Sequence, residues 1–343
     1  MQRTIMAAAA LLFIQIALAV ALNLTDTKTG DVSPAEPLLG FSADAVTAIE
    51  IAGPAGERLT IRKADGGWIL PEAQSAPAAA DQVNDLIARL ADLKQGLAVA
   101  TSEEAAKRFK VAENTFERHV VVKKGEETVG DLYVGTSPTF RQVHARKAGA
   151  REIVTAPLST FELETGPEKW LDKNLLRLKQ EEMEALVFTD FTLRKNDGNW
   201  QLADLEEGKA TDKEAADDLL SVVSGLAIQD VLNPQDTAAL FAGEPVLSFA
   251  VDLKEGKKLD YRFAKPEGSD YFVVKRSDRE LYGKVHTIQV ENLRKYTRDK
   301  LIKSEENLPA ESQGAPAAEA QEPVGPQIEG AEKAESGMEN NQQ

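Results

Sequence analysis

The chain of 343 residues has no cysteine and only three histidines. Without cysteine it cannot form disulfide bonds, use a thiol nucleophile or bind a metal through thiolates. The histidines, His119, His144 and His286, are far apart in the sequence, so no ligand spacing indicates a zinc site. Isolated histidines of this kind are typically structural or surface residues, and we expect neither a metal nor a cofactor.

Basic residues are also scarce relative to acidic ones. The 40 lysines and arginines are outnumbered by 56 aspartates and glutamates, which gives a formal net charge of −16. A chain this acidic has no overall electrostatic attraction to nucleic acid, and we expect no nucleic-acid partner. Half of the excess lies in residues 304–343, which hold nine glutamates, one lysine and no aromatic residue. That segment cannot bury enough apolar surface to offset chain entropy and is predicted to be disordered.

The sequence motifs of common enzyme classes are absent as well. The chain contains no P-loop, no dinucleotide-binding glycine pattern, no G-x-S-x-G nucleophile elbow and no H-E-x-x-H. The two glycines of GDLYVG at 130–135 lie in a predicted strand and not before a helix. We therefore assign no catalytic, cofactor-binding or metal-binding residue and expect a protein that is not an enzyme.

What the sequence does contain is a long-range internal repeat. Residues 59–68 read LTIRKADGGW and residues 191–200 read FTLRKNDGNW. The identical positions, each pair 132 residues apart, are Thr60 and Thr192, Arg62 and Arg194, Lys63 and Lys195, Asp65 and Asp197, Gly66 and Gly198, and Trp68 and Trp200. A spacing of that length is far beyond the period of a solenoid and indicates two copies of one whole domain.

Each half of the repeat is followed by the same succession of patterns. An apolar stripe at helical spacing runs over 83–93 in the first half and 216–226 in the second. The second helix is expected to begin with a capping box at Thr211–Glu214. Strand-like segments lie at 45–52, 57–63, 68–70, 117–123, 128–134, 246–253 and 258–263. We predict an α+β fold of two tandem copies of one domain, each an antiparallel β-sheet with packed helices, behind an N-terminal transmembrane helix.

These patterns divide the chain into five segments. They are a transmembrane anchor or signal peptide at 1–24, a spacer at 25–41, the first repeat domain at 42–178, the second repeat domain at 183–302, and the acidic tail at 303–343. The charged joint at 179–184 is too short to be a loose tether. We therefore expect the two domains to contact each other.

The repeated tryptophans and aspartates have both a structural and a functional interpretation. Trp68 and Trp200 follow a turn in a β-rich unit and are predicted to anchor the two cores, the alternative being a stacking platform for a ligand. Asp65-Gly66 and Asp197-Gly198 are typical of hairpin turns, in which aspartate bonds to the local backbone. The alternative for the aspartates is a pair of carboxylates contributed by two domains, as in glycosidases.

A run of charged residues in the second half has a similar ambiguity. Basic residues from Lys254 to Arg279 are interleaved with acidic residues, and three tyrosines lie among or just after them, Tyr261, Tyr271 and Tyr282. This mixture indicates a solvated face of mixed charge. An anion-binding or partner-binding face is the alternative.

The N-terminus carries the longest apolar run. Every residue from Ile5 to Leu22 is apolar except Gln15, and 18 residues of helix span roughly 27 Å, close to the thickness of the bilayer core. Arg3 precedes the run and acidic residues follow it, which orients the N-terminus to the cytoplasm. We predict a single-pass inner-membrane protein that contacts the lipid bilayer through residues 5–22 and has its body in the periplasm.

Two other interpretations of this run remain. A cleaved signal peptide is one, because residues 19–21 read Ala-Val-Ala and resemble a small-residue cleavage site. It would also place the body across the membrane. A buried core helix is the other, and the extreme N-terminal position and the flanking Arg3 disfavour it.

The arrangement of these elements resembles a bacterial family, the domain of unknown function DUF4340. The resemblance rests on the hairpins that end in G-x-W-x-L, at 66–70 and 198–202, on the helix and strands that follow, and on closing helices at 170–176 and 297–302. It covers about residues 45–302 in two copies. RFKVAENTF at 108–116 departs from the Phe-Gly-Leu segment that the family tends to show, and LFAGEPVLSF at 240–249 is closer to it.

The resemblance implies a role but no chemistry. Members of the family are often encoded beside ABC transporters of the gliding-motility and exporter type, which implies an extracytoplasmic accessory role without catalytic residues to transfer. We therefore expect a membrane-anchored, extracytoplasmic, non-enzymatic interaction protein whose partner is a membrane protein complex such as an ABC permease. The alternatives are an envelope hydrolase or glycan-active enzyme that uses an interdomain cleft, and a periplasmic ligand-binding protein.

Overall fold

The structure is a computed structural model that describes Gln15 and residues 36–303. Three predicted segments lie outside the described residues: the anchor at 5–22 except for Gln15, most of the spacer, and the acidic tail from residue 304. Within the described part of the chain, no helix is both long and apolar enough to cross a membrane. The described residues form antiparallel sheets with a few helices, which is the α+β class expected from the sequence.

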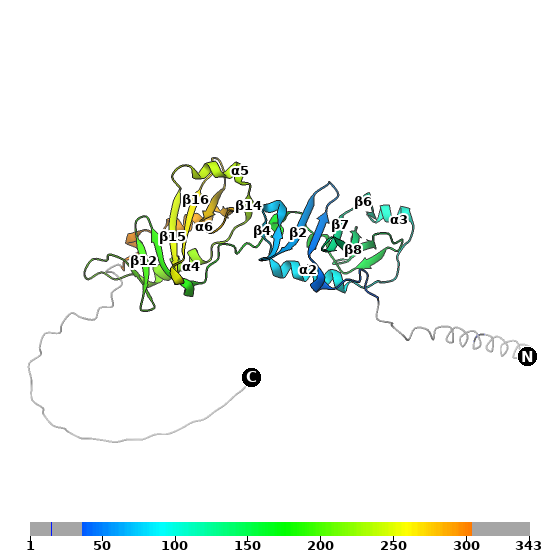
Figure 1. Cartoon of the computed structure of the whole chain (residues 1–343), viewed down its shortest axis with the longest axis horizontal. Helices are drawn as coiled ribbons and strands as arrows, with labels where there is room; N and C mark the ends of the chain where they lie inside the picture. Colours follow the sequence, from blue (N-terminus) through cyan, green and yellow to red (C-terminus); the bar gives the residue numbers. More distant parts are fainter. Residues whose placement is uncertain (1–14, 16–35, 304–343) are drawn as a thin grey trace, which may run out of the picture. The chain divides into compact units, whose positions relative to one another are not determined.

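The first large sheet has eight strands in the order β10-β9-β8-β7-β1-β2-β3-β4 (Figure 1). Its strands are β1 (Ala48–Ala52), β2 (Arg58–Ala64), β3 (Gly67–Leu70), β4 (Ala76–Pro77), β7 (Arg118–Lys124), β8 (Glu127–Val134), β9 (Val143–Lys147) and β10 (Val154–Ala156). Helix α2 (Ala80–Asp92) buries Val83, Leu86, Ile87 and Leu90, as its apolar stripe predicts. These side chains belong to the same core as Ile49, Ile61 and Val122 of the sheet.

The second large sheet also has eight strands, in the order β13-β12-β11-β15-β16-β17-β18-β14. Its strands are β11 (Met183–Phe188), β12 (Thr192–Asn196), β13 (Asn199–Leu202), β14 (Asp230–Leu232), β15 (Leu247–Leu253), β16 (Lys258–Ala264), β17 (Tyr271–Arg276) and β18 (Tyr282–His286). The helices of this half are α4 (Lys213–Ser224), α5 (Pro234–Thr237) and α6 (Thr287–Arg294). The strands expected at 246–253 and 258–263 are confirmed as β15 and β16.

Seven strands of each sheet follow one another in the same order. Reading across the sheets, β3-β2-β1-β7-β8-β9-β10 matches β13-β12-β11-β15-β16-β17-β18. Isolated bridges next to the helix starts also match, since Ala78 pairs with Leu171 and Thr211 pairs with Ile302. The five predicted segment boundaries, by contrast, stay predictions.

The repeated hairpins form because their sequence alternates apolar and polar residues around a tight turn. In β2, Leu59 and Ile61 are buried, whereas the next residue, Arg62, points to the opposite face and is exposed. In the second hairpin Asn196 pairs with Asn199, so the connection has two residues, Asp197 and Gly198, both with positive φ. This is the conformation of a type I′ turn, for which Asp-Gly is favoured. In the first hairpin the positive φ falls on Gly67 instead.

The start of α4 differs from the expected capping box. Asp212 is the N-cap, and its side chain accepts a hydrogen bond from the amide of Ala215 at 3.1 Å. Thr211 is not available as the cap because its hydroxyl accepts from the amide of Leu202 at 2.8 Å. Aspartate caps a helix as well as threonine does, so the helix begins one residue later than predicted.

The expected closing helices are also different. Residues 173–176 form turns, and the regular elements nearby are the 3-10 helices Pro167–Lys169 and Arg298–Leu301. These two elements occupy corresponding places. The carbonyl of Trp170 accepts a hydrogen bond from the amide of Ala79, which precedes α2, and the carbonyl of Leu301 accepts one from the amide of Asp212, which precedes α4. The matching Asp-Lys pairs of the sequence, 172–173 and 299–300, therefore do not superpose in register.

The first half contains a segment that the sequence did not predict. Helix α3 (Glu103–Arg108) and the hairpin β5 (Val111–Ala112) and β6 (Thr115–Phe116) precede β7. Residues of this segment form a second, smaller apolar cluster with Tyr133 of β8, whereas Leu132 and Val134 belong to the main core. Successive residues of a strand point to opposite faces, so this segment covers the face of the first sheet opposite α2.

Candidate functional site

The two repeated tryptophans occupy the same position in their hairpins but differ in burial. Trp68 pairs with Lys63 and Trp200 pairs with Lys195. Trp68 is 6% exposed, and its indole N–H donates to the side-chain oxygen of Asn84 on α2 at 2.9 Å. Trp200 is only partly buried, and its indole N–H has no hydrogen-bond partner among residues 36–303. Trp200 still packs against the main apolar core, as expected for a core anchor, but its burial is not equivalent to that of Trp68.

A cavity lies beside Trp200. It has a volume of about 550 Å³ and is lined by residues of β13, of the loop before α4, and of α4 itself, including Trp200, Thr211, Lys213 and Asp217. Asp217 of α4 occupies the position that corresponds to Asn84 of α2. Each directly follows the first buried residue of its helix, Ala216 in α4 and Val83 in α2. Asp217 is paired with Lys213 at 2.5 Å. The cavity thus combines an indole face with charged and hydroxyl groups, the combination that orients a small ligand.

The repeated Asp-Gly residues lie at turns. Asp65 and Gly66 connect β2 to β3, and Asp197 and Gly198 connect β12 to β13. All four are exposed. Each pair thus lies at the end of its own hairpin, in a separate sheet.

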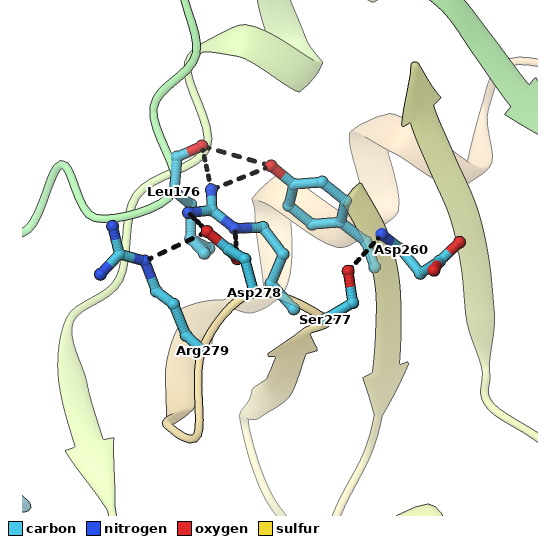
Figure 2. Close-up of polar contacts among 7 residues, drawn as sticks. Leu176, Asp260, Ser277, Asp278 and Arg279 are labelled. Atoms are coloured by element: carbon cyan, nitrogen blue, oxygen red, sulfur yellow. Dashed lines mark hydrogen bonds and ion pairs between the residues drawn. The ribbon is translucent and has the colours of Figure 1, made fainter. Parts of the chain in front are cut away.

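A polar cluster of the second sheet is hydrogen-bonded to the backbone carbonyl of Leu176, which follows the first sheet in the chain (Figure 2). Arg276 of β17 is 4% exposed and donates to both carboxylate oxygens of Asp278, at 2.6 and 3.0 Å. Its other terminal nitrogen donates to the Tyr261 hydroxyl and to the backbone carbonyl of Leu176, both at 3.2 Å. Tyr261 also donates to that carbonyl at 3.4 Å. The cluster fixes the chain after the first sheet to the core of the second.

Protonation equilibria in this cluster reflect burial and pairing. Burial raises the pKa of the Tyr261 hydroxyl, and the charge of Arg276 opposes part of that rise. Burial also acts to raise the pKa of Asp278, but hydrogen bonds and charge from Arg276 outweigh it and the pKa is lowered. For Arg276 burial acts to lower the pKa, and its bonds to Asp278 and Tyr261 more than compensate, so the pKa is raised. All three groups keep their neutral-pH forms, which suits a structural clamp.

Other backbone bonds also join residues 173–178 to the second half. The amide of Leu178 donates to the carbonyl of Ser224 at 3.0 Å, and the amide of Ile228 donates to Lys173 at 3.0 Å. In the first sheet, the register position that corresponds to Arg276 is held by Lys147, opposite Leu132. Lys147 is exposed. The buried Arg–Tyr clamp is therefore specific to the second sheet.

The histidines have structural partners. His119 lies 2.7 Å from the carboxylate of Asp131 and stacks on Tyr133 with ring centroids 4.3 Å apart. His144 is 9% exposed and stacks on Phe109 at 4.0 Å. His286 is exposed at the start of α6. Among the described residues, no group of histidine, aspartate or glutamate is arranged to hold a metal ion.

Two aromatic side chains of the first half project into solvent. Phe140 is 87% exposed and Phe161 is 82% exposed. They line one groove of about 520 Å³ together with Arg141 and Glu162. The guanidinium of Arg141 lies 5.3 Å from the centre of the Phe140 ring. Exposed aromatic residues beside an arginine are the composition of a protein-binding surface.

Two arginines, Arg276 and Arg146, are buried although the sequence did not single them out. Arg276 shares the alternation of Phe272 and Val274 in β17, so its place on the core face could have been read from the pattern. Arg146 of β9 is 9% exposed but alternates with the core residues Val143 and Ala145. Nothing in the sequence indicated it, because its burial comes from the unpredicted segment α3–β6.

Among the comparisons with known proteins, only the comparison with protein families finds a match to the chain. No curated protein and no solved structure matches the chain. A family described as a domain of unknown function, DUF4340, matches residues 68–242, just over half of the 343 residues. The match begins at Trp68 in β3 of the first sheet and ends after the 3-10 helix Ala238–Phe241 of the second half. The chain belongs to the DUF4340 family.

Proposed function

We propose that the chain is a membrane-anchored, extracytoplasmic accessory protein without enzymatic activity, and that it binds a membrane protein complex of the ABC transport type. The apolar run at 5–22 with Arg3 before it supports an anchor and places the body outside the cytoplasm. The body would then lie close to the outer loops of any permease in the same membrane.

The observation that carries the proposal is the exposed pair Phe140 and Phe161. A stable binding surface concentrates its energy in a few aromatic and arginine side chains that become buried in the complex. Phe140, Phe161 and Arg141 line one groove and provide such a set. Their apolar area has no cover among residues 36–303. We assign this groove to the extracytoplasmic loops of the permease.

We also propose that the two large sheets are copies of one domain. The equal order of seven strands and the matching bridges at Ala78 and Thr211 support a duplication. The copies have diverged: the first carries the segment α3–β6 and the exposed aromatic pair, and the second carries the Arg276 clamp. Divergence of this kind lets one copy bind a partner while the other keeps a structural role.

A pull-down from native membranes tests the proposal. Full-length tagged chain, extracted in mild detergent, is expected to recover an ABC permease. The double variant Phe140→Ala/Phe161→Ala is expected to lose it, because the loss of two hot-spot side chains costs about 2 kcal/mol or more each. Ile288→Ala, which removes a side chain that is 55% exposed in the second half, is the matched control and should recover the permease normally.

Two results would contradict the proposal. One is an equal recovery of the permease by the wild type and by the double variant, which would remove the groove from the interface. The other is recovery of no permease together with turnover of a peptidoglycan or glycan substrate that is lost when one carboxylate is replaced. That second result would establish the envelope enzyme instead.

A further inference from the structure

Arg146 is a largely buried cation that forms no ion pair among the described residues. Its Nε donates to the carbonyl of Val111 at 2.7 Å and a terminal nitrogen donates to the carbonyl of Ala150 at 3.0 Å. The guanidinium lies 5.0 Å from the centre of the Tyr133 ring. Within residues 36–303 it has no carboxylate partner, and its second terminal nitrogen makes no hydrogen bond.

The other buried arginine provides an internal comparison. Arg276, 4% exposed, is neutralised by Asp278 through two hydrogen bonds. Arg146 is 9% exposed and has only neutral partners. A buried charge without an opposite charge is costly, so proteins normally pair it. The unbonded terminal nitrogen of Arg146 is not itself buried, because the one buried side-chain polar atom without a partner among the described residues is Arg279 Nε. That nitrogen is therefore accessible to an anion supplied from outside the chain.

Arg146 faces a cavity large enough to hold such an anion. The cavity has a volume of about 710 Å³ and lies between α3, the β5–β6 turn and the turn after β9. Small-molecule pockets typically have volumes of about 300–1,000 Å³. A guanidinium binds carboxylates and phosphates through its planar fork, and here one edge of that fork has no protein partner.

The charges of the cavity wall narrow the class of ligand. Lys107 and Arg151 add positive charge near Arg146, while Glu103, Glu104 and Glu113 add negative charge. Three basic and three acidic side chains leave the cavity neutral overall. A polyanion such as a phosphate ester would be repelled by the glutamates, whereas a molecule with one carboxylate and one ammonium group would satisfy both signs.

We propose that this cavity binds a small zwitterion of the amino-acid or short-peptide class, with its carboxylate on Arg146 and its ammonium group toward the glutamates. The proposal does not depend on the permease partner, because the cavity and the groove at Phe140 share no lining residue. The site would give the accessory protein a ligand of its own.

Calorimetric titration of the full-length chain tests the site with three probes. The dipeptide alanyl-alanine carries both charges, N-acetyl-alanine carries only the carboxylate, and alanine amide carries only the ammonium group. Saturable binding is expected for the dipeptide, with at least about tenfold weaker binding for the other two, since each lacks one charge-assisted bond. Equal binding of N-acetyl-alanine and the dipeptide would overturn the assignment, and so would no binding of the dipeptide.

Variants then connect binding to Arg146. Arg146→Met is expected to weaken dipeptide binding at least about tenfold, and Glu113→Gln to weaken it less. Arg58→Gln, an exposed arginine of β2, is the matched control and should bind as the wild type does. If Arg146→Met fails to fold, the double variant Lys107→Gln/Arg151→Gln at the cavity wall provides the measurement. Undiminished binding in the folded variants would overturn the proposal.

Discussion

At the scale of single residues, the two repeated tryptophans show how one substitution changes a local structure. The indole N–H of Trp68 donates a hydrogen bond to the side-chain amide oxygen of Asn84, and the residue that corresponds to Asn84 in the second half is Asp217. The carboxylate of Asp217 bonds to Lys213 instead of the indole. Both residues of that pair line the cavity of about 550 Å³ beside Trp200.

Replacing Asp217 with Asn should stabilise the second half. An amide in this place can accept from the indole N–H of Trp200, which is worth about 0.5–1.5 kcal/mol, while the lost pair with Lys213 is worth about 0.3–0.5 kcal/mol. The free energy of unfolding should therefore rise by up to about 1 kcal/mol. Urea unfolding followed by tryptophan fluorescence measures it, and Asp218→Asn on the exposed side of α4 is the control. A lower stability than the wild type would refute the expected bond.

At the scale of elements, the core pattern was readable in the sequence and the covering segment was not. Alternation or helical spacing of apolar residues indicates burial of a single face of an element. This pattern predicted the hairpins, α2 and the strands β7, β8, β15 and β16. The segment α3–β6 has no such periodic pattern of apolar residues, because it is short and packs through the few residues around Val111. Consequently the cavity at Arg146 could not be predicted, since its walls come from that segment.

The clamp around Arg276 is the element-scale feature with a pH dependence. The folded pKa of Asp278 lies below its ordinary value of 3.8. Its contribution to stability is therefore complete above about pH 4 and disappears as the pH falls through the lowered folded pKa. Between those two limits the unfolded state binds a proton at Asp278 while the folded state keeps the carboxylate charge that neutralises Arg276, so the free energy of unfolding decreases as the pH falls.

Asp278→Asn should remove that dependence. At neutral pH the variant is expected to lose about 1–3 kcal/mol, because Arg276 stays buried without its carboxylate partner. Below the folded pKa of Asp278 the wild type and the variant should converge. Urea unfolding at a series of pH values measures both effects, with Asp260→Asn, an exposed carboxylate of β16, as the control. A constant difference between wild type and variant down to the lowest pH would contradict the role of the charge.

At the scale of the whole molecule, the described residues contain two large antiparallel sheets with the same order of seven strands. The repeat and the alternating and helical patterns predicted the class of fold, because such regions leave few other arrangements. These patterns could not predict the exposed pair Phe140 and Phe161, since their exposure depends on where their loops lie after folding. The anchor at 5–22 remains a prediction from the sequence and has its own test.

The anchor prediction makes the full chain of 37.2 kDa an integral membrane protein. After fractionation, the protein should stay in the membrane pellet through an alkaline carbonate wash, because an apolar helix of 18 residues partitions into the bilayer core. A tag after Gln343 should be degraded by protease added to spheroplasts, since the proposed orientation puts the body outside the cytoplasm. Replacing Leu11 and Ile14 with Asp should release the chain from the pellet, whereas Leu11→Ala should not. A mature chain that lacks residues 1–21 and is released without any substitution would instead establish the cleaved signal peptide, and a tag protected in intact spheroplasts would refute both forms of export.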